Sequence, residues 1–514
     1  MDGTSSFKKL NIMVNNRNTN PPDRKQDFIY VAILLAIAAG IGIYLIATTV
    51  LIAKDGVFYI EQAQKLSSKS IDVIQKHPPG YPFLIFVAYK LISFFSGSSS
   101  TYTWIYSAQS VTLLCRLLSL IPLYFIGKML VGGRKSFWAI LILIFLPHFA
   151  EFGSDALRDW PHFFFLAFGF WAILWGAKNR NCCWSFGLAG LCAGLGYVIR
   201  PECAQLIIYG MIWLGYCFLR PAVTTARKRT TLALIMIVLG FLLPAGPYTK
   251  ARGAVLPTKI RGLINAFSVE EQSYKSNELN RCLEEQLPTK YMAENSNVSF
   301  DALYNIYKDI GESLIWIFML PWFIGAFHYF RYSDAKKEKF LMSLFIAVNI
   351  TLLFLRSTNF DRAMSKRYVL PILALTIFYV ATGLELLSHK ILNQRWNSRI
   401  SNSQKRAWFY ALVVIGLCIC MPKLFRPIGA DKDGYLKAAN WLKENTCKKD
   451  IVAVPDKRIG FYADRKRAEK PEKSARYVVK NLENGEETPA GITEVWSTYL
   501  NKKKKNKVVI YQKI

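Results

Sequence analysis

Long apolar segments separated by short polar ones dominate the first 425 residues of the chain. A helix needs roughly 20 apolar residues to cross ~30 Å of hydrocarbon, and about eleven segments reach or approach that length. The sequence therefore predicts an all-α polytopic membrane protein. The predicted spans are 28–53, 104–127, 136–150, 160–177, 185–199, 203–219, 231–248, 313–330, 340–355, 368–387 and 407–425.

A further apolar segment, 79–95, decides the orientation of everything that follows it. If this segment does not cross, the basic loops at 128–135, 178–180, 220–229, 331–339 and 390–406 all share a side with the basic N-terminus. The positive-inside rule favours that arrangement. The segment also opens with Pro78-Pro79-Gly80-Tyr81-Pro82, which suits a helix that starts at the membrane surface. We therefore predict an interfacial or re-entrant helix in the first outer loop.

This topology divides the chain into three parts. Residues 1–27 form a cytoplasmic N-terminal segment, and residues 28–425 form the transmembrane domain, with outer loops at 54–103, 151–159, 249–312 and 356–367. Residues 426–514 change composition sharply and predict a small extracytoplasmic α/β domain. In this domain we expect helices at 434–445 and 493–500, and strands at 451–455, 459–462, 477–479 and 508–512.

Composition and charge narrow the class of protein further. Lys and Arg number 65 against 35 Asp and Glu, a net charge of +30, yet only 19% of residues are charged. In soluble domains about a quarter of the residues are charged. A low share of charged residues together with so large a basic excess means that the charges are segregated along the chain. The apolar content excludes disorder. The ten cysteines lack paired CxxC spacing, which argues against a structural zinc site. We expect no nucleic-acid partner.

Carboxylates cluster at the outer ends of the predicted spans, where charge is costly and often functional. Asp55 directly follows the first span and precedes an amphipathic segment, so it is also a natural helix N-cap. The short second outer loop holds Glu151, Asp155 and Asp159 with only Arg158 to pair with them. Asp159 precedes Trp160-Pro161 and could cap the next span, so structural and functional roles remain open for both Asp155 and Asp159.

Cations gather on the same outer side, against the positive-inside trend. They are Lys76, His77, Arg200 (beside Glu202), Arg356, Arg362, Lys366 and Arg367 (beside Tyr368). Cations held there suggest an anionic ligand. Together with the carboxylates they suit chemistry on a lipid-borne phosphate, because a carboxylate can act as base or metal ligand while cations stabilise the leaving phosphate.

The motifs also occur in a familiar order. They are Asp55 with Tyr59 and Ala63, Lys76-His77-Pro78-Pro79-Gly80-Tyr81-Pro82, Arg116-Leu117-Leu118-Ser119 with Pro147 and Asp159, Gly187-Leu188-Ala189-Gly190 through Arg200-Pro201-Glu202, and Arg367-Tyr368-Val369-Leu370-Pro371. This ordered set resembles the GT-C superfamily of membrane glycosyltransferases, which use polyprenyl-phosphate-linked sugars. It is similar to protein O-mannosyltransferases and lipid A aminoarabinose transferases.

The resemblance implies roles for individual residues. Asp55 would be the general base, and Asp159, favoured over Asp155 by its spacing from Pro147, would orient donor or acceptor. The two would hold Mg or Mn if a divalent ion is used; no other cofactor is implied. The phosphate would contact Lys76, His77, Arg200 and Arg367, and further substrate contacts would come from Tyr59, Arg158, Glu202 and Tyr368.

The resulting hypothesis is a multi-pass glycosyltransferase of the cytoplasmic (inner) membrane. It would take a sugar from a polyprenyl-phosphate donor among the membrane lipids and pass it to a glycan, lipid or protein on the extracytoplasmic face. Alternatives are oligosaccharyltransferase-like glycan transfer to protein, a non-catalytic lipid-binding scaffold, or a transporter or flippase for an anionic envelope precursor. A transporter should show repeated halves and polar residues near the bilayer midplane, and the sequence shows neither clearly.

Overall fold

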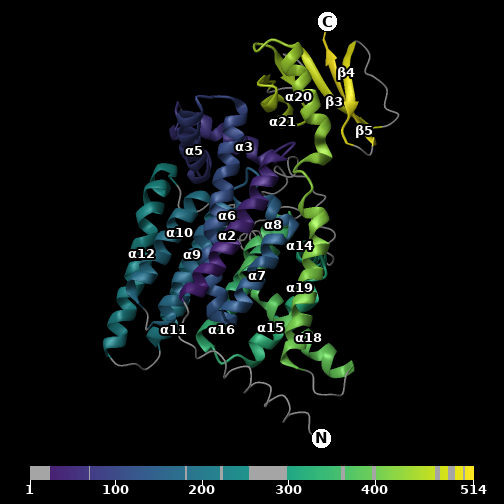
Figure 1. Ribbon diagram of the computed structural model, residues 1–514. Coiled ribbons are helices and arrows are strands. Elements are labelled where there is room, and N and C mark those ends of the chain that lie inside the picture. Colours follow the sequence, from purple (N-terminus) through teal and green to yellow (C-terminus); the bar gives the residue numbers. More distant parts are fainter. Residues whose placement is uncertain are drawn as a thin grey trace, which may run out of the picture.

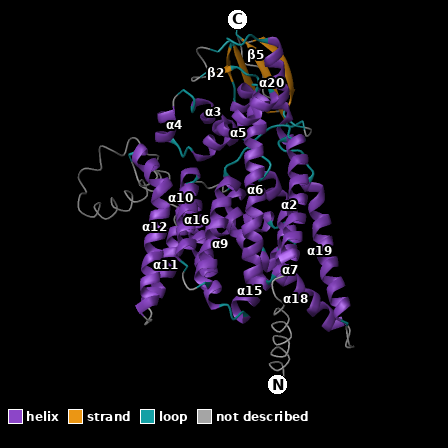
Figure 2. Ribbon diagram, turned by 60° about the vertical axis from the view of Figure 1, so that its left-hand side comes forward, coloured by secondary structure: helices purple, strands orange, loops and turns teal. Residues whose placement is uncertain are grey.

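The computed structural model describes residues 24–68, 70–179, 182–219, 224–253, 298–359, 365–395, 401–468, 475–483, 493–501 and 504–513. A tall helical bundle carries a small α/β domain at one end (Figure 1; Figure 2). We refer to that end as the domain face and to the other end as the opposite face. Residues 1–23 of the predicted N-terminal segment 1–27 lie outside the described residues. The same is true of residues 254–297 of the predicted outer loop 249–312.

Within these ranges, seven helices are long and apolar enough to cross a membrane, or eight if one bent pair counts as a single span. The seven are α2 (Arg24–Ala47), α6 (Thr101–Val131), α9 (Asp159–Lys178), α11 (Gln205–Leu219) with the preceding η1 (Pro201–Ala204), α12 (Thr224–Arg252), α16 (Lys336–Asn359) and α19 (Asn402–Leu424). The bent pair joins η4 (Lys366–Val369) and α17 (Leu370–Thr376) to α18 (Phe378–Arg395) with a bend of 62°.

The remaining predicted spans coincide with shorter helices. They are α7 (Gly133–Phe145, 13 residues), α10 (Cys183–Ile199, 17 residues) and α15 (Met319–Tyr332, 14 residues). Helix α8 (Pro147–Phe152) follows α7, and α14 (Val298–Ser313) precedes α15. Helices this short need tilt, neighbours or bilayer thinning to span. The chain is a multi-pass membrane protein, and the number eleven stays a prediction.

Three helices between the first two spans cover the domain face. They are α3 (Lys54–Lys65), α4 (Ser70–Lys76) and α5 (Gly80–Ser96). Asp27 at the start of α2 accepts a hydrogen bond from Tyr124 near the end of α6 (2.7 Å), whereas Thr49 beyond the end of α2 bonds Gln109 near the start of α6 (3.1 Å). The two spans are therefore antiparallel neighbours. The chain leaves and re-enters the bundle at the same face, and α5 makes no net crossing.

Small residues and buried amides fix how the spans pack. A Cβ on Gly325 of α15 would lie 1.8 Å from the carbonyl oxygen of Tyr379 in α18, so only glycine permits this close crossing. Between α11 and α16, Asn349 donates to Gln205 Oε1 (3.0 Å) and to Tyr209 Oη (3.1 Å). Buried amides with satisfied hydrogen bonds fix the register of the two helices.

The C-terminal domain contains α20 (Asp433–Asn445), α21 (Lys457–Tyr462) and one five-stranded sheet. Its strands are β1 (Ile451–Ala453), β2 (Lys466–Arg467), β3 (Tyr477–Glu483), β4 (Thr493–Tyr499) and β5 (Asn506–Gln512). Their spatial order is β2-β1-β3-β5-β4. Strand β1 runs parallel to β2 and β3, and β5 runs antiparallel to β3 and β4.

Two local predictions in this domain are wrong. Residues 459–462 form part of helix α21 instead of a strand, because Asp456 caps the N–H of Arg458 and places Ile459 and Tyr462 on one buried face. Residues 493–499 form strand β4 instead of a helix. This β-branched and aromatic segment pairs with β5, and tertiary pairing outweighs its weak helical pattern.

The C-terminal domain is fixed to the bundle and shares a hydrophobic core with α3, α5 and α6. The backbone N–H of Ile52 donates to the Tyr462 hydroxyl (3.1 Å), and Arg458 donates to the Ile52 carbonyl (3.2 Å). Arg458 is itself held by Asp456 (2.8 Å). The domain therefore clamps the short connection that leads from the first span into α3.

Candidate active site

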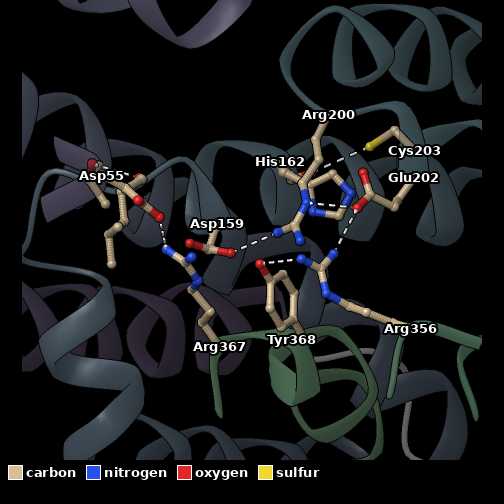
Figure 3. Close-up of polar contacts among 11 residues, drawn as sticks. Asp55, Asp159, His162, Arg200, Glu202, Cys203, Arg356, Arg367 and Tyr368 are labelled. Atoms are coloured by element: carbon tan, nitrogen blue, oxygen red, sulfur yellow. Dashed lines mark hydrogen bonds and ion pairs between the residues drawn. The ribbon is translucent and has the colours of Figure 1, made fainter. Parts of the chain in front are cut away.

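Helix α3 presents Asp55 at the domain face. Its N-cap is Ala53, whose side chain cannot cap, and Asp55 lies in the first turn. The sequence had allowed Asp55 to cap this helix. In the structure its carboxylate instead contacts Nη1 of Arg367 at 2.6 Å. The Asp55 side chain is 42% exposed and that of Arg367 23% exposed. Asp55 is therefore oriented by a cation and open to solvent on its other side (Figure 3).

Asp155 has a different role. Both of its carboxylate oxygens accept from the N–H of Ala53 at 3.0 Å, and Oδ1 also accepts from Ala156 N–H at 2.7 Å. Burial raises the pKa of Asp155 to about 7, although these hydrogen bonds oppose the shift. Asp155 thus ties the second outer loop to the start of α3, which is a structural function.

Asp159 instead enters a chain of charged side chains. It begins α9, is 2% exposed, and accepts from Arg200 Nη1 at 2.7 Å. Arg200 also donates through Nε to Glu202 at 3.2 Å, and Arg356 lies 3.9 Å from the same Glu202 oxygen. Alternating acids and guanidiniums therefore join α9, η1 and α16 just below the domain face (Figure 3).

Tyr368 lies at the centre of the cations. The Arg356 guanidinium stacks 3.4 Å from the centre of its ring and donates to its hydroxyl at 2.5 Å. Arg200 and Arg367 lie 5.0 and 5.4 Å from the same ring centre. The aromatic face stabilises guanidiniums that would otherwise repel one another. Cations from the end of α10, from α16 and from η4 itself thus converge on one tyrosine.

The charges of the described site residues do not balance. Four guanidiniums, of Arg158, Arg200, Arg356 and Arg367, face the carboxylates of Asp55, Asp159 and Glu202. Arg158 stacks 5.5 Å from the Tyr59 ring and makes no ion pair among the described residues. The Nε of Arg367 is buried and has no hydrogen-bond partner in the part of the chain that the structure describes. A surplus cation and an unused N–H donor create a site for an anion.

The structure places most of the predicted site residues in this cluster, but not all of them. Tyr59 is buried beneath Arg158, and burial raises its pKa. The ring of His77 lies edge-on to Phe58 of α3, with 4.9 Å between the ring centres. The side chain of Lys76 lies outside the described part of the structure.

His162 belongs to the site although the sequence interpretation did not include it. It follows Asp159 by one helical turn and is 2% exposed, and neither ring nitrogen has a hydrogen-bond partner among the described residues. Figure 3 shows its ring beside Arg200 and Glu202. The spacing from Asp159 on a predicted helix could have indicated it. By contrast, Arg116 of the recognised motif is structural: it packs on Trp160 inside the bundle.

Both aspartates that could hold a divalent ion are engaged by guanidiniums. Within the described residues no three His, Cys, Asp or Glu side chains are grouped to hold a metal. Asp55 and Asp159 are each bonded to a guanidinium, at 2.6 and 2.7 Å. A cation placed between them would have to displace or approach Arg367 and Arg200, which is electrostatically unfavourable.

A family model matches part of the chain, and solved structures share its fold. The family model described as dolichyl-phosphate-mannose-protein mannosyltransferase matches residues 76–248, which include Arg158, Asp159, Arg200 and Glu202. The structure is similar to that of ArnT from Cupriavidus metallidurans bound to undecaprenyl phosphate, with a TM-score of 0.56, 12% identity, and coverage of 95% of this chain and 98% of that chain. The chain has the GT-C fold.

A second similar structure is the archaeal oligosaccharyltransferase AglB from Archaeoglobus fulgidus, in complex with an inhibitory peptide and a dolichol-phosphate. The TM-score is 0.54, the identity 12%, and the coverage 88% of this chain and 69% of that chain. No curated protein sequence matches the chain significantly. The GT-C resemblance seen in the sequence motifs is thereby confirmed, and the structural similarity to ArnT covers 95% of this chain, which includes most of the C-terminal domain.

Proposed function

We propose that the protein is a membrane glycosyltransferase that moves a sugar from a polyprenyl-phosphate donor to an acceptor on the extracytoplasmic face of the cytoplasmic membrane. The observation that carries this proposal is the position of Asp55, a solvent-open carboxylate at the edge of a guanidinium-rich site. Undecaprenyl phosphate and dolichol-phosphate are present in the similar ArnT and AglB structures, which supports a lipid-phosphate donor here.

In the proposed reaction, the Asp55 carboxylate accepts the proton of an acceptor hydroxyl as that oxygen bonds to the anomeric carbon of the sugar. The bond from that carbon to the phosphate oxygen breaks, and the polyprenyl phosphate leaves with the electron pair. Direct displacement inverts the anomeric centre. Arg367 holds Asp55 at 2.6 Å in one orientation, so the base is positioned before the acceptor arrives.

The guanidiniums supply the other half of the chemistry. Negative charge grows on the phosphate as the sugar leaves, and preorganised donors stabilise charge that develops in the transition state. Arg158 and the unused Nε of Arg367 are the donors best placed for this charge. Asp159 keeps Arg200 in place at 2.7 Å, and Glu202 keeps Arg200 and Arg356 together.

We further propose that transfer needs no divalent ion. The guanidiniums already provide positive charge where a metal would act, and both aspartates are bonded to them. The orientation follows from the charges at the opposite face. There Lys128 pairs with Asp27, and Lys135 lies 2.6 Å from Glu385, within a surface rich in lysine and arginine. By the positive-inside rule that surface faces the cytoplasm.

The test is direct transfer by the purified protein in nanodiscs. A panel of radiolabelled undecaprenyl-phosphate hexoses and pentoses is incubated with detergent-extracted envelope acceptors, and labelled product and released undecaprenyl phosphate are both counted. We expect one donor to react, with or without EDTA. A protein that moves a labelled lipid across proteoliposomes but never cleaves it would be a transporter, and the proposal would fail.

A further inference from the structure

A pocket of about 420 Å³ lies outside the guanidinium cluster, between α3, the start of α6 and the C-terminal domain. Its lining includes the cations Lys448, Arg465, Lys466 and Arg467 and the acids Glu61 and Asp464. Because four cations face two acids, the lining is basic. The proposed reaction gives no role to this pocket or to its charge.

The pocket and Asp55 lie along the same face of α3. Steps of three residues lead from Asp55 through Phe58 to Glu61 and Gln64, and side chains at this spacing form a continuous ridge on a helix. Glu61 and Gln64 line the pocket. A ligand that fills the pocket and extends along the ridge therefore reaches the proposed catalytic base.

Cations of the C-terminal domain follow the same ridge. The ammonium of Lys457, on α21, lies 5.3 Å from the centre of the Phe58 ring, and Arg467 lies 2.5 Å from Glu61. Gly460 makes room for Arg467, because a Cβ there would be 2.6 Å from its Cγ. The docking of α21 on the residues before α3 thus places Lys457 beside Phe58, one helical turn from Asp55, and Arg467 beside Glu61 one turn further on.

Lys457 and Lys466 are the cations best able to receive a ligand. Asp456 is engaged by Arg458 and Glu61 by Arg467, which leaves Lys457 with a ring contact and no ion pair among the described residues. Burial lowers the pKa of Lys457, as expected for a partly desolvated ammonium whose charge is incompletely balanced. Lys466 is exposed at the mouth of the pocket.

We propose that this basic pocket and Lys457 form the acceptor subsite, and that the acceptor carries an acidic group beside the hydroxyl that receives the sugar. The inference rests on the proposed function, since it names the class of acceptor. The acidic group is a carboxylate or a phosphate; an ammonium stabilises either as a point charge. A neutral acceptor would offer no negative charge to the ammonium groups of Lys457 and Lys466.

Binding is measured first without any donor, by calorimetry on the purified protein in nanodiscs. The probes are a hexamer of galacturonic acid, neutral maltohexaose of the same length, and glycerol 3-phosphate. We expect the acidic probes to bind, more weakly as salt is added, and maltohexaose not to bind. The tighter of the two acidic probes identifies the carboxylate or the phosphate as the natural group.

Variants then locate the binding. Lys466→Gln and Lys457→Gln should each weaken the acidic probe about tenfold, the scale of one charge-assisted hydrogen bond. Lys437→Gln is the matched control, because this lysine lies on α20 of the same domain and pairs with Asp433 at 2.7 Å. Equal binding of maltohexaose, or equal losses in Lys437→Gln and Lys466→Gln, would overturn the inference.

Donor turnover in the same preparation separates this inference from the proposed function. If the protein cleaves a labelled undecaprenyl-phosphate sugar but no acidic probe binds, only the acceptor subsite is refuted. If acidic probes bind through Lys457 and Lys466 but no donor is ever cleaved, the proposed function is refuted, and the bound anion is not an acceptor.

Discussion

Substitution of Asp55 by Asn tests the chemistry most directly. Asn keeps the size and polarity of the side chain but cannot take a proton from an acceptor hydroxyl. General-base assistance is typically worth about 10²–10⁴-fold, so single-turnover transfer should fall by at least about 10²-fold. Asp55→Glu keeps the carboxylate but displaces it by one methylene, and it should retain a small residual rate.

The structure indicates that this loss will not come from unfolding. The Asp55–Arg367 pair is 2.6 Å long, but its side chains are 42% and 23% exposed. Partly exposed pairs contribute about 0–1 kcal/mol, and the N-cap of α3 is Ala53, so no cap is lost. Donor affinity should stay equal or increase, because the Arg367 guanidinium becomes available to the phosphate.

Asp433→Asn is a matched control. Asp433 lies in the first turn of α20, is 42% exposed like Asp55, and pairs with Lys437 at 2.7 Å. This variant removes an equivalent ion pair away from the site and should transfer at the wild-type rate. The assay is single-turnover transfer from a saturating labelled donor in nanodiscs, with thermal unfolding measured in parallel. If Asp55→Asn keeps more than about a tenth of the wild-type rate, the assignment of Asp55 as base is refuted.

The remaining predictions concern the other charged residues and one helix crossing. Asp159→Asn should lower turnover more than Asp155→Asn in the same transfer assay, and a larger loss at Asp155 would reverse their roles. The folded-state pKa of Asp155, about 7 against an ordinary 3.8, means that its proton stabilises the fold at low pH and that this stability is lost as pH rises through about 7. Asp155→Asn should therefore reduce any fall in unfolding temperature between about pH 5 and about pH 8; an unchanged pH profile would contradict this. Arg367→Ala should weaken donor binding roughly tenfold, and Lys should restore it only in part because an ammonium cannot form a bidentate contact; full restoration would indicate a simple headgroup anchor. Gly325→Ala should cost about 1–3 kcal/mol of stability, because its Cβ would lie 1.8 Å from a backbone oxygen, whereas Gly40→Ala, with nothing within 4 Å, should be neutral in thermal unfolding.

The sequence was sufficient for features that depend on local composition. Apolar length located the helices, and charge asymmetry favoured a first outer loop that does not cross, because both follow from the cost of burying polar groups in hydrocarbon. The order of polar motifs indicated the GT-C fold, which the structural comparison confirms. Asp55, Asp159, Arg200 and Arg367 were predicted as site residues from their unusual positions at the ends of apolar segments, and the structure brings these four side chains together.

Tertiary structure alone decided how these residues are paired. From the sequence, Asp55 could have been a helix N-cap. Local pattern also left both structural and functional roles open for Asp155 and Asp159. The fold brings Arg367 to Asp55 and Arg200 to Asp159, and it gives Asp155 to the backbone of Ala53. Each partner comes from a different helix, and contacts between distant segments leave no period or local composition to detect.

The C-terminal domain shows most clearly that local sequence does not reveal contacts between distant segments. Residues 493–499 became a strand because β5 offered an edge to pair with, and α21 became a helix that docks before α3. That docking places Lys457 beside Phe58, one turn from the proposed base. Nothing near Lys457 in the sequence distinguishes it from the other lysines of a basic tail. Its position depends on a buried core shared between two domains, so only the folded chain reveals it.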